Sequence, residues 1–247
     1  MEKLENLLTG KVTTLKKGSI VVESPLTERE NQVTKYVASR LPQFEKSQLR
    51  RKFPDLKHEG PIVLFDLETS GLGAKSSVVS IAYAVLKDGQ LTDYCVFPSD
   101  PGSEGEAISH FLRSFHTGAT FVTFNGNSFD VPKLSSRARQ WGVQANGNPT
   151  ETFAEHLASR HIDVYPLARR AFRSSNGAGY NSLQAVERLE FEYERPNDLP
   201  SKKIPEVYRR WVYQRDNPQQ VAQLIDHNMQ DNRTSAAILL KLLERKN

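Results

Sequence analysis

The chain has 247 residues, of which 38% are hydrophobic and 25% are charged, and these proportions exclude a disordered or collagen-like chain. No apolar run approaches the ~18 residues that a transmembrane helix needs, and the opening MEKLENLLTG lacks the apolar core of a secretory signal, so we expect no membrane association. The single cysteine, Cys95, excludes an intrachain disulfide and suits a reducing compartment, so we expect a cytoplasmic protein.

The net charge of +4 is unevenly distributed along the chain. Residues 1–59 hold 12 Lys and Arg against 8 Asp and Glu, whereas residues 60–247 hold 21 of each kind. The whole basic excess therefore lies in the first segment. Such an excess is compatible with a nucleic-acid partner, although many proteins of other function share it.

Residues 1–59 are predicted to form a small basic appendage. Residues 12–24 resemble two short strands around a Lys-Gly turn, and apolar residues at helical spacing predict a helix over residues 27–41. A basic stretch follows and ends at Gly60-Pro61, where we place the boundary with a second domain, residues 60–247. We expect that the appendage can be removed without unfolding the rest and that it helps to hold substrate.

The second domain begins with strands and continues with alternating strands and helices. Residues 61–68 form an apolar run that ends in acids, as in a buried strand, and residues 76–97 predict two strands joined at Asp88-Gly89. The later elements are expected as helices at 105–116, 128–142 and 181–191, strands at 119–125 and near 161–163, a helix up to 172, a loop at 194–206, and one long or two shorter helices over 220–246. This order predicts an α/β fold, with a sheet covered by helices.

Two acids stand one residue apart at the end of the first apolar run. Asp66 and Glu68 would share one face of the strand, because side chains two residues apart point the same way. Their mutual repulsion would be relieved by a divalent cation, and Mg²⁺ and Mn²⁺ prefer carboxylate oxygen. Taken alone, the pair is about equally well explained by a strand end that reaches solvent.

Two further segments carry candidate acids on predicted helices. Asp130 opens the helix in SFDVPKL, where an acid also suits the helix dipole. Asp231 lies in HNMQDNRTSAAIL, and a continuous helix would place His227, four residues earlier, on the same face. Asp226, five residues before Asp231, is the rival of His227 for a role beside attacking water. Each segment alone is also typical of an ordinary helix surface.

Together the three segments resemble the motifs of the DEDD superfamily of 3′→5′ exonucleases, the DnaQ-like branch of the ribonuclease-H-like fold. LFDLETSGL resembles the first motif, FNGNSFDVPKL the second and HNMQDNRTSAAIL the third, over residues 61–243. NDLPSKKIPEVYRRW and the closing His-Asn-x-x-Asp are similar, more narrowly, to the YprB-type ribonuclease-H-like domain. One departure is that the spacing His-x₃-Asp combines the histidine of one DEDD class with the spacing of the tyrosine class.

The resemblance implies a mixed sheet flanked by helices and a two-metal phosphodiesterase. Two divalent cations, Mg²⁺ or Mn²⁺, would be held by the four acids of the motifs, and His227 would assist the attacking water. The substrate would be nucleic acid, most simply a single-stranded 3′ end, cut to nucleoside monophosphates. The implied metal ligands are Asp66, Glu68, Asp130 and Asp231.

The resemblance also implies contacts to the terminal nucleotide. The turn Thr69-Ser70-Gly71-Leu72 would cradle it, with Leu72 against a base, and Asn125 would hydrogen-bond to sugar or phosphate. Two alternatives to an exonuclease stay open: a non-catalytic nucleic-acid-binding module of the same fold, and a structure-specific endonuclease. The sequence does not choose between DNA and RNA, because no residue can be assigned to the 2′-hydroxyl.

Overall fold

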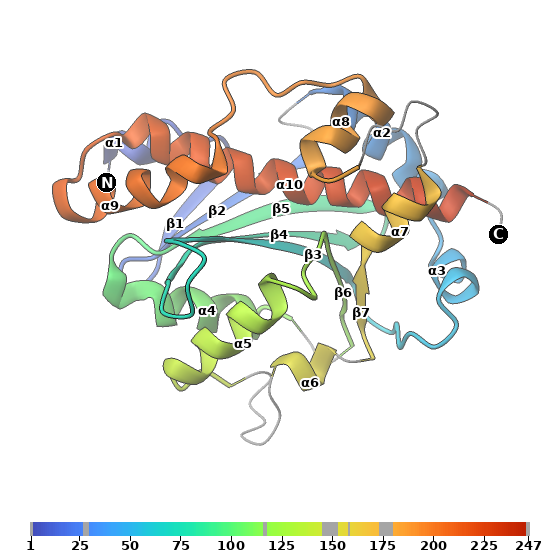
Figure 1. Cartoon of the computed structure of the whole chain (residues 1–247), viewed down its shortest axis with the longest axis horizontal. Coiled ribbons are helices and arrows are strands. Elements are labelled where there is room, and N and C mark those ends of the chain that lie inside the picture. Colours follow the sequence, from blue (N-terminus) through green and yellow to red (C-terminus); the bar gives the residue numbers. More distant parts are fainter. Residues whose placement is uncertain are drawn as a thin grey trace.

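A mixed sheet, with helices on both faces, organises the molecule (Figure 1). The computed structural model describes residues 2–26, 30–115, 118–144, 153–157, 159–172 and 180–245. Within these residues the sheet has seven strands in the order β1-β2-β5-β4-β3-β6-β7. The strands are β1 (Lys11–Thr14), β2 (Ile20–Pro25), β3 (Ile62–Thr69), β4 (Val78–Lys87), β5 (Gln90–Phe97), β6 (Thr120–Thr123) and β7 (His161–Asp163). The expected α/β mixed sheet flanked by helices is thereby confirmed.

The helices lie between and after the strands. The α-helices are α1 (Glu2–Glu5), α2 (Gln32–Arg40), α3 (Lys46–Lys52), α4 (Glu104–Arg113), α5 (Asp130–Gln140), α6 (Phe153–Leu157), α7 (Val164–Ala171), α8 (Leu183–Phe191), α9 (Ile204–Gln214) and α10 (Pro218–Glu244). Short 3₁₀ helices are η2 (Leu41–Gln43), η3 (Pro101–Ser103) and η5 (Ser201–Lys203). The segment over 220–246 forms one continuous helix up to Glu244 rather than two.

Two helical layers cover the sheet. The helices α4, α5 and α6 lie below it in Figure 1, and α10 crosses above it with α7, α8 and α9 nearby. The lower core joins Phe65 and Tyr83 of the sheet to Phe111 of α4. Above the sheet, the first half of α10 packs with α9, and its second half packs with α2, α7 and α8. The long helix therefore belongs to both parts of the upper core.

The pleat of β3 decides which layer its acids face. Ile62 and Leu64 pack into the upper core, whereas Val63, Phe65 and Leu67 pack into the lower one. Side chains alternate along a strand, so residues 66 and 68 continue the series of 62 and 64 and face α10. Antiparallel pairing with β4 and parallel pairing with β6 hold β3 at the centre of the sheet.

The hairpin expected at Asp88-Gly89 is confirmed. Both residues have positive φ, 51° and 75°, which is the conformation that a two-residue hairpin turn needs. The turn connects β4 directly to β5, with Lys87 opposite Gln90. The helix expected over residues 27–41 begins at Gln32, because Asn31 caps it, and residues 27–29 lie outside the described part of the chain.

The first 59 residues share the sheet and the core of the rest. β2 pairs with β5 along its whole length, from Ile20 opposite Phe97 to Pro25 opposite Thr92. Val37 of α2 and Leu49 of α3 are fully buried in the same cluster as the second half of α10. These contacts argue against harmless removal of residues 1–59, and the proposed boundary at residue 60 stays a prediction.

No helix among the described residues combines the length and the apolar character that crossing a bilayer requires.

Deletion of residues 1–59 is expected to destabilise the protein, because it uncovers the edge of β5 and apolar side chains of both upper clusters. We expect an aggregated product or a clearly lowered melting temperature. The matched point variant Leu49→Ala should lower the free energy of unfolding by about 2–5 kcal/mol, as for other buried leucines. A truncated protein that melts at the wild-type temperature would show instead that the segment is an independent appendage.

Candidate active site

Four carboxylates from three elements converge beside the carboxyl end of β3. Asp66 and Glu68 come from β3, Asp130 opens α5, and Asp231 lies near the middle of α10. The charges of the other three acids all raise the pKa of Asp66, which places them within electrostatic reach of it. The structure thus brings together the four acids that the sequence motifs single out.

Asp130 is fixed by the backbone of the neighbouring strand. Its Oδ1 accepts a hydrogen bond of 2.9 Å from the Leu67 N–H, between the two acids of β3. The turn before α5 is held by Asp163, whose carboxylate accepts from the backbone N–H groups of Asn125 at 2.8 Å and Asn127 at 3.1 Å. Asp163, at the end of β7, therefore holds this turn in place and so sets the position at which α5 begins.

Burial raises the pKa values of three of these acids, because it removes water from their charged forms. The pKa of Asp66 lies well above its ordinary value, through burial and then the charges of Asp130, Asp231 and Glu68. Burial raises the pKa of Glu68 to about 8 and that of Asp130 to about 7. Hydrogen bonds from Asn228 and from Leu67 counteract the shifts of Asp66 and Asp130.

His227 lies between the acids and a loop. The residue is only 3% exposed, and the continuous α10 puts it on the same face as Asp231. Its Nε2 atom is 3.5 Å from a carboxylate oxygen of Glu68 and 3.5 Å from one of Asp231. Its Nδ1 atom lies 2.7 Å from Oδ1 of Asp198 in the loop between α8 and α9. The pKa of His227 is raised: burial lowers it, but the hydrogen bond to Asp198 and the charges of Asp231 and Glu68 outweigh burial.

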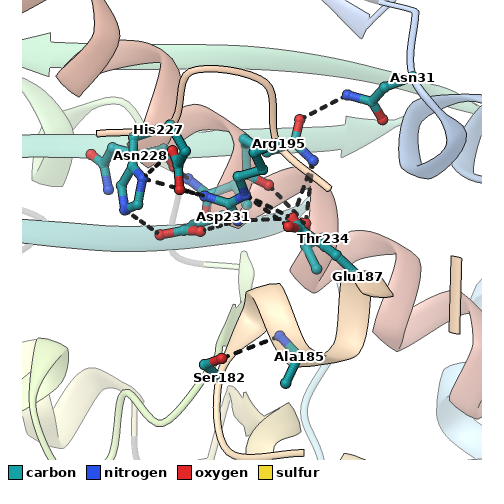
Figure 2. Close-up of polar contacts among 12 residues, drawn as sticks. Asn31, Ser182, Ala185, Glu187, Arg195, His227, Asn228, Asp231 and Thr234 are labelled. Atoms are coloured by element: carbon teal, nitrogen blue, oxygen red, sulfur yellow. Dashed lines mark hydrogen bonds and ion pairs between the residues drawn. The ribbon is translucent and has the colours of Figure 1, made fainter. Parts of the chain in front are cut away.

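A buried arginine from the same loop neutralises part of this negative charge (Figure 2). The Arg195 guanidinium donates two hydrogen bonds of 2.8 Å to the Glu187 carboxylate of α8 and one of 2.5 Å to Asp231 Oδ1. The side chains of Arg195 and Glu187 are 5% and 1% exposed. Because Arg195 occupies Oδ1 of Asp231, Oδ2 is the oxygen that faces His227.

Asn228 supports Asp66 from the other side of the acid cluster. Its Nδ2 donates to Asp66 Oδ2 at 2.6 Å, and its Oδ1 accepts from the Ser80 hydroxyl at 2.7 Å. Ser80 lies directly opposite Glu68 in the β3–β4 pair and also touches the buried Cys95 thiol. The serine thereby fixes which end of the Asn228 amide points at Asp66.

The predicted substrate contacts lie on the turns that follow β3 and precede α5. After β3, the chain turns through Ser70, whose backbone and hydroxyl pair with Ser77, and through Gly71, whose φ is 156°. The Thr69 hydroxyl donates to the Gly71 carbonyl at 2.8 Å, so it stabilises the turn. Leu72 is 88% exposed, which leaves it free to contact a ligand. Asn125 is exposed with φ of 65° at the start of the turn before α5.

The donor set suits a hard divalent cation. Ligand atoms of Glu68, His227 and Asp231 lie within 4.8 Å of one another. These acids raise one another's pKa although Arg195 and His227 lie beside them, so further positive charge would stabilise the cluster, and a cation such as Mg²⁺ or Mn²⁺ would supply it. Asp226, five residues before Asp231, does not share that residue's face of the continuous helix α10.

The sequence motifs did not reveal the partners of these acids. Arg195 and Asp198 lie in a stretch predicted only as a loop, and Glu187 lies on an ordinary amphipathic helix. The Asp-Leu-Pro segment was the one available signal, through its similarity to the YprB-type domain. Asn228 was adjacent to a predicted residue, but its contact with Asp66 depends on how α10 crosses β3.

The metal-free protein should lose stability as the pH rises. The folded pKa of Glu68, about 8, exceeds its ordinary value of 4.5, so the folded chain holds more protons between these values and its free energy of unfolding falls with rising pH. Glu68→Gln should therefore melt at a higher temperature than wild type in EDTA near the upper value, with a smaller difference at the lower one. The exposed Glu194→Gln serves as control, and identical pH profiles for Glu68→Gln and wild type would contradict this electrostatic reading.

Arg195→Leu should destabilise the fold strongly, because Glu187 would stay buried without its counter-charge. Loss of one partner of a buried pair costs about 3–5 kcal/mol, which denaturant unfolding measures readily. The double variant Glu187→Leu with Arg195→Leu removes both charges and should recover much of this loss. If the single variant unfolds at the wild-type denaturant concentration, the pair does not stabilise the protein.

Comparison with known proteins places these features in a family. Residues 63–243 match the RNase_H superfamily. The chain is 25% identical to YprB of Bacillus subtilis (strain 168) over 172 residues, 69% of this chain and 39% of YprB. It is 29% identical over 82 residues to a DNA polymerase of Methanocaldococcus jannaschii, 29% of this chain and 5% of the polymerase.

A solved structure has the same fold. The family B DNA polymerase of Pyrobaculum calidifontis superposes with a TM-score of 0.54 at 20% identity, covering 75% of this chain and 25% of the polymerase. The chain thus spans less than half the length of each of these relatives. Since the matched region contains the sheet from β3 onward and all four acids, the chain belongs to the RNase_H superfamily.

Proposed function

We propose that the protein is a metal-dependent 3′→5′ exonuclease acting on DNA or RNA. Membership in a superfamily of nucleases supports nuclease activity generally. The observation that carries the finer proposal is the convergence of Asp66, Glu68, Asp130 and Asp231, the first two half-buried and the last two buried, with raised pKa values for the first three. Acids gathered in this way destabilise a metal-free site and favour cation binding.

The four carboxylates would hold two divalent cations, Mg²⁺ or Mn²⁺, which supply positive charge to the scissile phosphate and lower the pKa of the attacking water. The remaining steps belong to side chains of the protein. His227 Nε2 faces the gap between Glu68 and Asp231, where it can accept a proton from water. The exposed Leu72 and the turn that carries it would contact the terminal nucleotide.

Metal dependence provides the first test. The protein is incubated with Mn²⁺ or Mg²⁺ and with end-labelled single-stranded DNA and RNA, and products are separated by length. We expect degradation that EDTA abolishes and added metal restores, because every acid ligand is an oxygen donor. Asp66→Asn should be inactive yet folded. Undiminished degradation in excess chelator would exclude the mechanism, and metal-independent binding without cleavage would indicate a non-catalytic binding module.

The direction of cleavage provides the second test. A label at the 5′ end should yield a descending ladder, and a chemically blocked 3′ end should resist degradation. A circular substrate offers no end and should stay intact. Discrete cuts within the circle would favour a structure-specific endonuclease on the same fold.

His227→Ala should lower the rate constant by about 10²–10⁴-fold, the usual contribution of a general base. Substrate affinity should change little, because the imidazole is buried. Asp226→Ala is the matched variant one residue earlier on α10, and we expect it to be nearly silent because Asp226 does not share the face of α10 that carries Asp231. The opposite pattern would assign the supporting role in the third motif to Asp226.

A further inference from the structure

The loop between α8 and α9 contacts the two residues of α10 that the proposed mechanism uses, His227 and Asp231. Arg195 binds Oδ1 of Asp231, and three residues later Asp198 binds Nδ1 of His227 (Figure 2 shows Arg195, Asp231 and His227). The proposed function accounts for His227 and Asp231 but assigns nothing to this loop. The contact of Asp198 is the more specific of the two, because it selects one nitrogen of the ring.

The loop is built to hold Asp198 in one place. Asn197 has a φ of 56°, a left-handed conformation that asparagine tolerates well, so the chain turns just before the acid. Leu199 follows and is buried in the cluster that joins α9 to the first half of α10. The acid is therefore anchored on both sides along the chain.

Two groups compete for Nδ1 of His227. Asp198 Oδ1, an acceptor, lies at 2.7 Å, whereas the Arg195 Nη1 atom, a donor, lies at 3.4 Å. The contact with Asp198 is much the shorter of the two, and the Arg195 guanidinium already donates to Glu187 and Asp231. The proton of the neutral ring is thereby favoured on Nδ1. Nε2 then carries the lone pair and points toward Glu68 and Asp231.

We infer that Asp198 is a positioning residue, which holds the His227 ring in the tautomer and orientation that present a basic Nε2 to the acid cluster. This inference rests on the proposed function. In the reaction the water oxygen forms its bond to phosphorus, and one water proton passes to Nε2. The phosphorus–oxygen bond to the leaving 3′ oxygen breaks, and that oxygen takes a proton from solvent. Asp198 faces the opposite nitrogen and stabilises the protonated ring.

The tautomer itself can be measured without any nuclease assay. The protein is labelled with ¹⁵N at histidine, freed of metal, and studied in alkaline solution by long-range ¹H–¹⁵N correlation, with His227→Gln to assign the ring. We expect the Nδ1–H tautomer in wild type and in the exposed loop control Glu194→Gln. Asp198→Ala should shift the ring toward the Nε2–H form. A wild-type ring in the Nε2–H form, or a spectrum unchanged by Asp198→Ala, would overturn the inference.

Kinetics then test whether Asp198 acts through His227. Asp198→Ala should lower kcat by about 10–100-fold, the range typical of residues that orient a metal-binding histidine through its other ring nitrogen, with little change in KM. In the His227→Ala background the same change should have no further effect. An equal loss in both backgrounds would overturn the inference. Asp198→Asn, which keeps an acceptor oxygen and the side-chain shape, should retain more activity than Asp198→Ala, and the reverse order would contradict a positioning role.

The two sets of measurements separate the inference from the function on which it rests. If neither DNA nor RNA is degraded, yet Asp198→Ala still moves the proton of the ring, the exonuclease proposal fails and the positioning of His227 stands. If the protein degrades nucleic acid and Asp198→Ala is silent in both measurements, the exonuclease proposal stands and the positioning role is lost.

Discussion

The alternation of β3 is the constraint on which the site depends. The face of β3 that buries Ile62 and Leu64 against the upper layer continues into Asp66 and Glu68. The central strand therefore places two carboxyl groups at the edge of the upper core. Water is largely absent there, which raises the pKa of both acids. The surrounding helices consequently have to supply donors and counter-charges. Asn228 gives an amide to Asp66, and Arg195 neutralises Asp231.

Negative charge and positive charge are not balanced inside this cluster. Arg195 is shared between Glu187 and Asp231, so one guanidinium already has two carboxylate partners. Asp66, Glu68 and Asp130 add three more acids to the cluster. Folding tolerates this excess because protons remain on the buried acids, as their raised pKa values indicate. On the proposed function, the same excess would favour cations, which would displace those protons. Stability of the metal-free protein and affinity for metal would then oppose each other.

The sequence indicated which acids come together better than it indicated their surroundings, and the reason is physical. Asp66 and Glu68 end an unbroken apolar run, and His227 and Asp231 keep helical spacing, so local periodicity placed each pair on one face, while the family resemblance of the three segments was needed to single the pairs out. Pairing between distant strands has no such local signal: β2 was expected in an appendage, yet it lies beside β5. The roles of Arg195 and Asp198 likewise depend on where a loop returns over α10. Only the packed structure reveals such contacts.

The path of α10 has a consequence for how the protein tolerates substitution. The helix packs against one cluster from Val221 to Met229 and against another from Ala236 to Leu242, so His227 lies in the first stretch and Asp231 between the two. A small shift of either half moves the functional side chains relative to β3, because a helix transmits displacement along its axis. Conservative substitutions far from the acids, such as the removal of one methyl group from a side chain packed against α2 or α9, would then lower activity although the protein stays well folded. A genetic screen for loss of function would therefore find substitutions along the whole of α10, and not only at the site.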